Sequence, residues 1–422
     1  MIQRFPIVGI DVAKSFCLYA VLSPTGDVFM KTLKAFTDKE GLDFALRQLK
    51  KVENAFNSKP AIVLESTGHY SQRIVHFFCN RGFKVFLVNP LVSHSIKSSL
   101  IRKVKTDKVD AEELARLFFL RPLREFAKQD EQYFNLKALS RAALLLSEQR
   151  VTMVNQLTAA VEQVMPTYSR VFPNIASDTS LELLTRYPAP DQLQRAPKED
   201  VIHVIQAYSR RGLGYSQTKY ELLINCAEES KSIGILLAGL YEVIRIYAVN
   251  LQHMNAQIKQ LENKIHDLSF QIPAIALLAT IPGIGRKLAH ILTSEIGDIN
   301  RFKSAKQLIA YCGIDPSVKQ SGNFSATKNR ISKRGSPFAR KALYIAASVV
   351  IRQSATGTFV NPVLHTYYQQ KIQTKPKKQA LGAVMNKIVR IVYSVLKNGT
   401  PFELITPQEQ EKKYKNALKI VA

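Results

Sequence analysis

Tryptophan is absent from this chain of 422 residues, and cysteine is scarce. The four cysteines (Cys17, Cys79, Cys226 and Cys312) form no C-x-x-C pair, and three of them lie among apolar neighbours. This spacing disfavours a zinc site or a disulfide framework and predicts buried, reduced thiols. Apolar runs long enough to cross a bilayer, a signal-peptide pattern and a lipid-modified or basic amphipathic segment are also missing. We therefore expect a cytoplasmic protein with no membrane role.

Acidic residues are few compared with basic ones. The chain has 33 Asp and Glu against 59 Lys and Arg, a formal net charge of +26. A surplus of this size predicts a polyanionic partner, because Lys and Arg that neutralise phosphates release bound counterions. The charge fits DNA and RNA equally well. The content of 46% hydrophobic and 22% charged residues is typical of a folded protein, and the length predicts two or three domains.

The first 125 residues have the pattern of a mixed α/β domain. Buried strands are expected at 5–12, 16–22, 28–33, 61–65 and 85–88, and helices at about 37–52, 70–80 and 107–118. Thr37 and Glu40 form a capping-box pattern that opens the first helix. Three strands followed by alternating helices and strands give the ribonuclease-H-like order.

Four acidic residues of this domain could form a metal site. Asp11 and Glu65 each end a buried apolar strand, where a charge is costly unless a metal ion or a partner compensates it. Asp107 and Asp110 lie three residues apart at the start of a predicted helix, so both project from one face. Four converging carboxylates can hold two Mg²⁺ ions, or Mn²⁺, about 3.5–4 Å apart for phosphoryl transfer.

Each of these acids has a simpler alternative. An Asp after a strand is often a turn residue, and Asp107 could merely favour a helix N-terminus. Gly9-Ile10-Asp11 before a hairpin also opens actin-like ATPases. The chain has neither a second copy of that hairpin nor an adenosine-binding glycine pattern, so the metal-site hypothesis is the better one.

The middle of the chain, 126–272, is expected to be helical. Apolar residues recur in alternating steps of four and three from Ile233 to Leu268, over about five heptads. A second seam runs from Leu136 to Val164 and is broken at Arg150. We interpret the seams as an antiparallel coiled-coil arm or a dimerisation element, with 166–215 as an inserted Pro-rich helical segment. Pairing within one chain and pairing between chains both fit this pattern.

The C-terminal part, 273–400, is expected to be mainly helical, with 401–422 as a peripheral tail. Gly283 and Gly285 lie between two apolar helical segments, a pattern typical of a helix-hairpin-helix that binds the DNA backbone. An ordinary turn between helices is the alternative. Ser321 precedes a glycine in a basic, loop-rich region, where it could act as a nucleophile if nearby cations hold a phosphate. Most Ser-Gly pairs are turns, so this signal is weak alone.

Basic residues beside these features are the candidate nucleic-acid contacts. They are Arg102, Lys103 and Lys105 before the acidic helix, Arg286 and Lys287 after the glycine turn, and Lys328, Arg330, Lys333 and Arg334 after the serine.

Two groups of motifs resemble the DEDD transposases of insertion sequences, a family that includes the pilin-gene site-specific invertases. The N-terminal motifs are Gly9-Ile10-Asp11-Val12-Ala13-Lys14, Leu64-Glu65-Ser66-Thr67-Gly68 and Lys105-Thr106-Asp107-Lys108-Val109-Asp110-Ala111. The C-terminal motifs are Ile281-Pro282-Gly283-Ile284-Gly285, Gln320-Ser321-Gly322 and Ile331-Ser332-Lys333-Arg334-Gly335. The similarity covers roughly 5–120 and 275–350, in the family's order.

The resemblance implies a RuvC-like domain that holds Mg²⁺ on Asp11, Glu65, Asp107 and Asp110, and a covalent nucleophile at Ser321. It also implies a homodimer or homotetramer whose two kinds of domain cooperate across subunits on DNA. Members of this family choose target and donor DNA with a structured bridge RNA, so an RNA partner is implied as well. The family often has two serines before the glycine.

In this chain Gln320 takes the first of those two serine positions, which singles out Ser321 and leaves Ser317 and Ser325 as fallbacks. Two other functions fit the same features. One is a structure-selective endonuclease of the Holliday-junction type, which cleaves without a covalent intermediate. The other is a DNA-bridging scaffold with degenerate acids.

Overall fold

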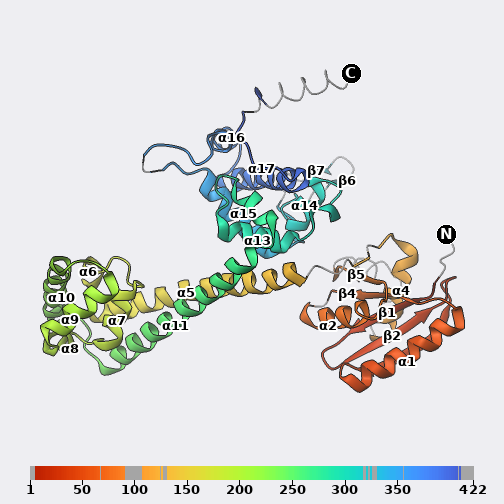
Figure 1. Cartoon of the computed structure of the whole chain (residues 1–422), viewed down its shortest axis with the longest axis horizontal. Helices are drawn as coiled ribbons and strands as arrows, with labels where there is room; N and C mark the ends of the chain where they lie inside the picture. Colours follow the sequence, from red (N-terminus) through yellow and green to blue (C-terminus); the bar gives the residue numbers. More distant parts are fainter. Residues whose placement is uncertain are drawn as a thin grey trace. The chain divides into compact units, whose positions relative to one another are not determined.

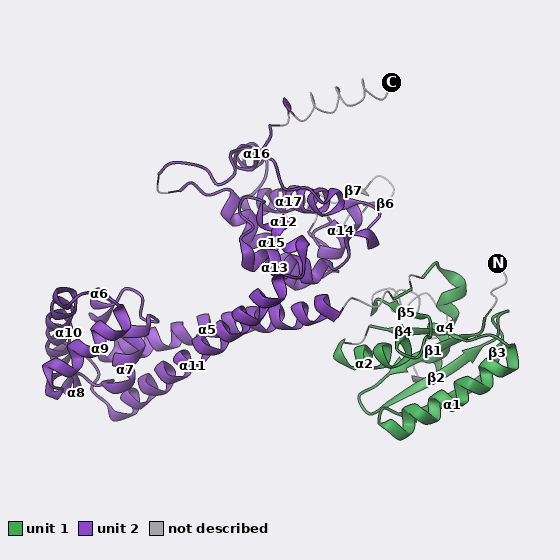
Figure 2. Ribbon diagram, viewed as in Figure 1, with its two compact units in different colours: residues 1–128 green, residues 129–422 purple. Residues whose placement is uncertain are grey.

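A computed structural model describes most of the chain and divides it into two compact units, Met1–Lys128 and Gln129–Ala422 (Figure 2). The described residues are 5–66, 68–90, 107–123, 125–126, 131–316, 320–321, 324–325, 330–354, 356–406 and 408–409. None of the helices among them combines the length and the apolar character needed to cross a membrane.

The first unit is built on a five-stranded sheet with the order β3-β2-β1-β4-β5 (Figure 1). Its strands are β1 (Ile7–Val12), β2 (Phe16–Leu22), β3 (Val28–Phe36), β4 (Ala61–Glu65) and β5 (Val85–Val88). The first three form an antiparallel meander, and β4 and β5 add in parallel beside β1. The predicted mixed sheet is therefore confirmed, and its strand order is consistent with a ribonuclease-H-like domain.

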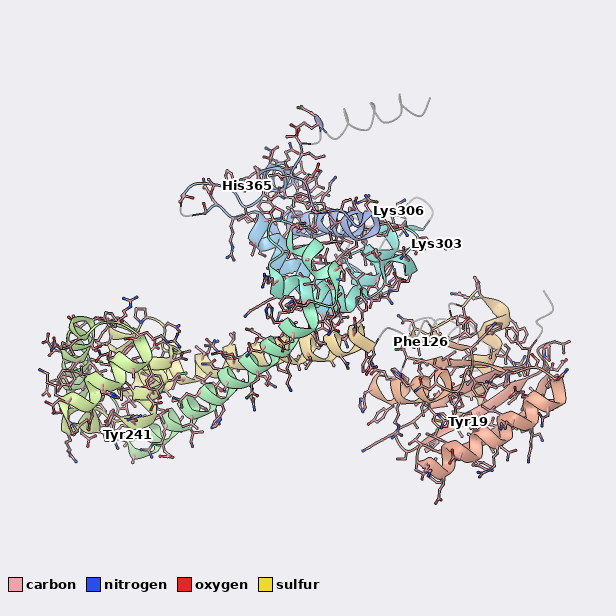
Figure 3. All side chains as sticks on the ribbon, viewed as in Figure 1. Tyr19, Phe126, Tyr241, Lys303, Lys306 and His365 are labelled. Atoms are coloured by element: carbon pink, nitrogen blue, oxygen red, sulfur yellow. The ribbon has the colours of Figure 1, made fainter. Side chains whose placement is uncertain are left out.

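Helices cover both faces of this sheet. On one face α1 (Lys39–Phe56) and α2 (Gly68–Cys79) share a core with Tyr19, whose ring packs edge-on against Phe78 (Figure 3). On the other face α4 (Asp107–Leu120) buries Leu114 and Leu117 against β1, β4 and β5. The sheet is buried on both sides, which explains why β1 and β4 are continuous apolar runs.

The cap of α1 differs from the prediction. The Asp38 side chain, not that of Thr37, accepts a hydrogen bond from the Gly41 backbone N–H at 2.8 Å. Thr37 is buried and donates instead to the Lys14 carbonyl oxygen at 3.3 Å. Asp and Thr are both good cap residues, so the tertiary contact of Thr37 decides between them.

In the second unit, two long helices, α5 (Glu131–Val164) and α11 (Ala238–Ser269), lie side by side (Figure 1). We call this pair the arm. Leu136 near the start of α5 shares a core with Ile265 near the end of α11, and Leu157 shares another with Ile244. The two helices therefore run antiparallel within one chain. Where Arg150 interrupts the predicted seam, its Nε donates to Asn255 Oδ1 of the other helix at 2.5 Å.

Five helices, α6 to α10, pack on one end of the arm and form what we call the tip subdomain, residues 165–237. They are α6 (Tyr168–Val171), α7 (Asp178–Arg186), α8 (Pro190–Arg195), α9 (Lys198–Ser209) and α10 (Leu213–Ile233). Their apolar side chains join those of the arm in one core. The inserted helices extend past 215 to Ile233, because α10 carries buried Leu223 and Cys226 into that core.

The other end of the arm joins a helical domain with a core of its own. Its helices are α12 (Pro273–Ala279), α13 (Arg286–Ile296), η1 (Ile299–Arg301), α14 (Ala305–Cys312), α15 (Pro337–Val350), α16 (Pro362–Ile372) and α17 (Lys377–Asn398). A short hairpin, β6 (Gln320–Ser321) and β7 (Phe324–Ser325), lies between α14 and α15. The mainly helical character predicted for this part is confirmed. All four cysteines are free thiols, and Cys17, Cys226 and Cys312 are buried.

Candidate active site

Asp11 and Glu65 lie at the carboxyl ends of neighbouring parallel strands. The register pairs Ile10 of β1 with Leu64 of β4, so the two acids occupy the next position on each strand. Both are only partly buried, whereas the apolar residues before them are fully buried. The carboxyl ends of parallel strands meet at one edge of a sheet, which is where α/β folds place ligands. The strand order thus brings these two acids to one edge.

The start of α4 reaches the same edge. Ala111 packs with Leu18 and Ala20 of β2, which pair with Asp11 and Gly9 of β1. Further along, α4 packs against the opposite end of the strands, where Leu114 shares a core with Ile7. The helix therefore runs antiparallel to β1, and its N-terminus lies at the end of β1 that carries Asp11.

Gly9 sets the close approach of this helix. A Cβ atom at position 9 would lie 1.9 Å from the Ala111 carbonyl oxygen, so no other residue fits without moving the helix. Asp110, directly before Ala111, is half-buried. Asp107 begins the helix, one turn earlier on the same face, and its side chain lies outside the described residues. The backbone thus brings all four positions to one end of the sheet.

The donors available at this edge are carboxylate oxygens. Among the described side chains, which do not include that of Asp107, no group of three or more His, Cys, Asp or Glu is placed to hold a metal ion. Oxygen donors without His or Cys suit hard divalent cations such as Mg²⁺ or Mn²⁺. Burial, with a smaller contribution from the Asp11 charge, raises the pKa of Cys17 to about 12, so this neighbouring thiol stays protonated and is a poor metal ligand.

In the second unit, Gly283 and Gly285 form the turn between α12 and α13. Gly283 has a φ of +88°, and a Cβ atom there would lie 2.2 Å from Val350 Cγ1. Gly285 precedes the first turn of α13, where backbone N–H groups have no partner within the helix. This geometry leaves the helix N-terminus exposed, with Arg286 and Lys287 beside it. Lys287 also contacts Glu262 at 2.5 Å.

Ser321 lies on the short β6–β7 hairpin, where it pairs with Phe324. Backbone bonds hold the segments before and after this hairpin together: Ser332 N–H donates to the Asp315 carbonyl oxygen at 2.8 Å and Lys333 N–H to that of Gly313 at 3.0 Å. The Asp315 carboxylate also accepts from Ser332 Oγ and from Arg334, the latter at 3.1 Å. The side chains of Ser321 and Ser325 lie outside the described residues.

The remaining candidates are placed as follows. Arg330 and Lys333 are exposed, and Arg334 is exposed despite its ion pair with Asp315. Four predicted contacts and one fallback serine lie outside the described residues: Arg102, Lys103, Lys105, Lys328 and Ser317.

Comparisons with known proteins agree with this arrangement. A family model described as "Transposase", for the DEDD transposases of IS110 type, matches residues 8–166, and one described as "Transposase IS116/IS110/IS902 family" matches residues 275–369. Together the two matches span more than half of the chain. The chain belongs to the IS110/IS116 family of DEDD transposases.

Several curated relatives resemble this transposase over most of its length. The pilin gene-inverting protein of Moraxella bovis is 28% identical over 350 residues, 81% of each chain. An IS110 protein of Streptomyces coelicolor is 24% identical over 330 residues, 77% of this chain and 79% of the relative. An IS116 protein of Streptomyces clavuligerus is 20% identical over 409 residues, 96% of this chain and 97% of the relative. Enzymes of this family perform phosphoryl transfer on DNA, and their acidic residues typically hold divalent metal ions.

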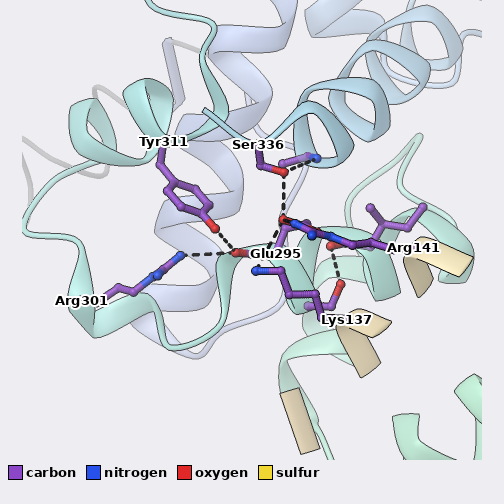
Figure 4. A network of polar contacts seen from close by, with 9 residues as sticks. Lys137, Arg141, Glu295, Arg301, Tyr311 and Ser336 are labelled. Carbon is purple, nitrogen blue, oxygen red and sulfur yellow. Dashed lines mark hydrogen bonds and ion pairs between the residues drawn. The ribbon is translucent and has the colours of Figure 1, made fainter. Parts of the chain in front are cut away.

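The sequence analysis missed a buried carboxylate of the transposase. Glu295 on α13 is fully buried, and Arg141 of α5 grips it with two hydrogen bonds, Nε to Oε1 at 2.5 Å and Nη2 to Oε2 at 2.9 Å (Figure 4). Ser336 Oγ, at the start of α15, donates to Oε2 at 2.8 Å, and Lys137 lies 3.8 Å away. The arm, α13 and the segment after the serine hairpin therefore meet at one carboxylate.

Burial would raise the pKa of Glu295, but Arg141, Lys137 and Ser336 outweigh it and hold that pKa below its ordinary value. A signal existed in the sequence: Glu295 is an acid directly before Ile296 and close to Ile291 and Leu292, the apolar residues that α13 buries. Its partners could not be found this way, since Arg141 is 154 residues distant. A second omission is Asn89, which directly follows β5, the strand beside the one that ends at Glu65.

Loss of the Glu295 carboxylate is expected to weaken the second unit. Glu295→Ala leaves the Arg141 guanidinium in a largely buried place without its partner, and removing one member of a buried pair costs about 3–5 kcal/mol. Because the Arg141 side chain is 35% exposed, we expect about 3 kcal/mol in the free energy of unfolding, measured by urea denaturation. The control is the exposed ion pair between Lys287 and Glu262. Glu262→Ala should lower the free energy of unfolding by less than about 1 kcal/mol.

The ion pair between Glu295 and Arg141 predicts that the stability of the fold depends on pH. A carboxyl group with a lowered pKa in the folded state stabilises the fold above its unfolded pKa of about 4.3. That stability is lost as pH falls from about 5 through the folded pKa. The wild-type chain should therefore lose more stability between about pH 6 and about pH 3 than the Glu295→Ala variant. Equal losses in both proteins would contradict the assignment.

Proposed function

We propose that this transposase cuts and rejoins DNA at specific sites with two groups: divalent ions held by Asp11, Glu65, Asp107 and Asp110, and the hydroxyl of Ser321. The observation that carries the proposal is the edge of the sheet at which two parallel strands end and α4 begins. Four acidic positions, from three segments distant in the sequence, lie where these elements end or begin at this edge. An acid at the end of a buried strand is costly unless a metal ion or a partner compensates its charge, and a shared metal site would supply that compensation.

The donor set fits Mg²⁺, with Mn²⁺ as a substitute, because all four ligands would be carboxylates. Ions bound there would polarise a phosphodiester and stabilise the oxygens that attack and leave. The protein's own part is to fix the ligands. The β1–β4 register fixes the backbone at Asp11 and Glu65. The contact of Gly9 with Ala111 of α4 fixes the backbone at Asp110, which directly precedes Ala111.

Ser321 is the proposed nucleophile. In the reaction its hydroxyl proton passes to solvent, its oxygen bonds to phosphorus, and the bond from phosphorus to a deoxyribose oxygen breaks, after which that oxygen takes up a proton as a free hydroxyl group. The pairing of 313–316 with 331–333 supports this assignment, because it fixes the base from which the β6–β7 hairpin extends. Exposed Arg330 and Lys333 beside that base supply positive charge for a phosphate. The α12–α13 turn is proposed to bind the DNA backbone as a helix-hairpin-helix.

A structured guide RNA and a homodimer or homotetramer complete the proposal. The family resemblance supports both, and the net charge of +26 supports two polyanionic partners on one chain. The curated relatives that invert pilin genes support recombination at defined sites. In such an assembly the acidic edge of one subunit and the serine hairpin of another would act on the same phosphodiester.

The test uses the full chain, purified from its host with its bound nucleic acid, and DNA taken from either side of its own reading frame. We expect a covalent protein–DNA species, with the DNA attached to the peptide that contains Ser321 when mapped by mass spectrometry. Its formation should need Mg²⁺ and a discrete small RNA, and RNase should abolish it. Cleaved DNA with no adduct would indicate a structure-selective endonuclease, and random co-purifying fragments would contradict RNA guidance.

A further inference from the structure

A cavity opens where the tip subdomain meets the arm. Its volume is about 510 Å³, within the range of roughly 300–1,000 Å³ found for pockets that hold small ligands. Arg150 and Asn255 line it from the two arm helices, and the rest of its wall comes from the segment between α6 and α7, the start of α7, the end of α9 and the start of α10. It contains none of the acids or serines assigned to catalysis, so it is a separate site. Apart from its first two residues, the tip lies between the two family matches, which cover residues 8–166 and 275–369.

Three aromatic side chains line the cavity, and one of them is open to solvent. Phe172 and Tyr215 belong to the edge of the tip core, whereas Tyr208 is 42% exposed and contributes little to that core. The Arg211 guanidinium lies over the Tyr215 ring, 4.7 Å from its centroid. Aromatic rings and guanidinium planes are the surfaces on which unpaired nucleobases stack.

The polar groups of the cavity suit the phosphate of a nucleotide and the amino group of its base. Arg150 uses only its Nε–H on Asn255, and among the described residues its terminal nitrogens have no partner. Arg211 is exposed and forms no ion pair within the described part of the chain. Two such guanidinium groups can bind a phosphate. Asp178 can accept a hydrogen bond from the amino group of a base.

We infer that this cavity binds an unpaired nucleotide of a single-stranded nucleic acid. The base stacks against Tyr208 and the Tyr215–Arg211 pair, and Arg150 and Arg211 hold the adjoining phosphate. A base paired in a duplex cannot enter, because its faces are covered by its neighbours. The inference does not depend on how the transposase cuts DNA.

Photocrosslinking of the full chain tests it. The probes are a single-stranded RNA that carries 4-thiouridine, a DNA of the same sequence that carries 4-thiothymidine, and the duplex forms of both. We expect adducts on the peptides that contain Phe172, Tyr208 or Tyr215 with at least one single strand, and much weaker labelling by duplexes. The RNA and DNA arms identify which nucleic acid is the source. Adducts confined to other peptides, or equal labelling by duplexes, would overturn the inference.

Variants of exposed residues sharpen this test, since they should fold normally. Tyr208→Ala should lower the yield of tip adducts about tenfold, as expected for one lost stacking partner, and Tyr208→Phe should stay within about twofold. Arg211→Ala should also lower it, whereas Arg195→Ala, which removes an equally exposed cation from α8, should not. Unchanged labelling of Tyr208→Ala would reject the site. Asp11→Asn should give the same yield of tip adducts as wild type. A failure of the catalytic proposal would therefore leave these adducts unchanged and can be told apart from a failure of the nucleotide site.

Discussion

Ser321→Ala is expected to stop recombination and to remove the covalent protein–DNA species completely. Alanine lacks the oxygen that would bond to phosphorus, and loss of a covalent nucleophile lowers turnover by about 10⁴-fold or more. DNA binding should persist, because the contacts assigned to the α12–α13 turn and to Arg330 are untouched. The measurements are recombined product, adduct on a denaturing gel, and binding of the same DNA.

The matched controls are the two fallback serines. Ser325→Ala changes the strand that pairs with β6 and keeps Ser321, so it tests whether damage to the hairpin alone stops the reaction. We expect Ser325→Ala and Ser317→Ala to retain the adduct. If the adduct survives in Ser321→Ala and disappears in one of the other two, the nucleophile has been assigned to the wrong serine, and the covalent mechanism still stands.

Asp11→Asn should slow DNA cleavage about 10³-fold or more at saturating Mg²⁺. An amide is a weaker and uncharged ligand, and a bound metal ion contributes several kcal/mol to charge stabilisation in phosphoryl transfer. The side chain lies near the carboxyl end of β1 and is only partly buried, so the melting temperature of the first unit should change little. Rates measured over a range of Mg²⁺ concentrations, with chelator as the zero point, give the comparison.

Asp27→Asn is the control for this substitution. It makes the same chemical change in the exposed turn between β2 and β3, where the Asp27 carboxylate accepts a hydrogen bond from the Thr25 hydroxyl. Its cleavage rate should equal that of wild type. A wild-type chain that bridges DNA but cleaves none under any metal would favour the scaffold. Normal cleavage by Asp11→Asn would remove Asp11 from the metal site.

The first unit could be predicted from the sequence in some detail because its signals are local. A strand buried on both faces must be an apolar run, so Ile7–Val12 and Ala61–Glu65 are visible without any tertiary information. An acid at the end of such a run is conspicuous for the same reason. The cap of α1 was the exception: adjacent Thr37 and Asp38 are both good cap residues, and only the bond from Thr37 to Lys14 separates them.

What the sequence by itself determined is the order of the elements, the positive charge, and the positions at which carboxylates and a serine can carry chemistry. Tertiary structure alone decided that the two arm helices pair within one chain, that Glu295 meets Arg141, and that a cavity forms where the tip joins the arm. The physical reason is the range of the contacts. Periodicity and capping act over a few residues. These three features instead join side chains from segments far apart in the chain, and the free energy of each contact depends on a geometry that no local pattern encodes.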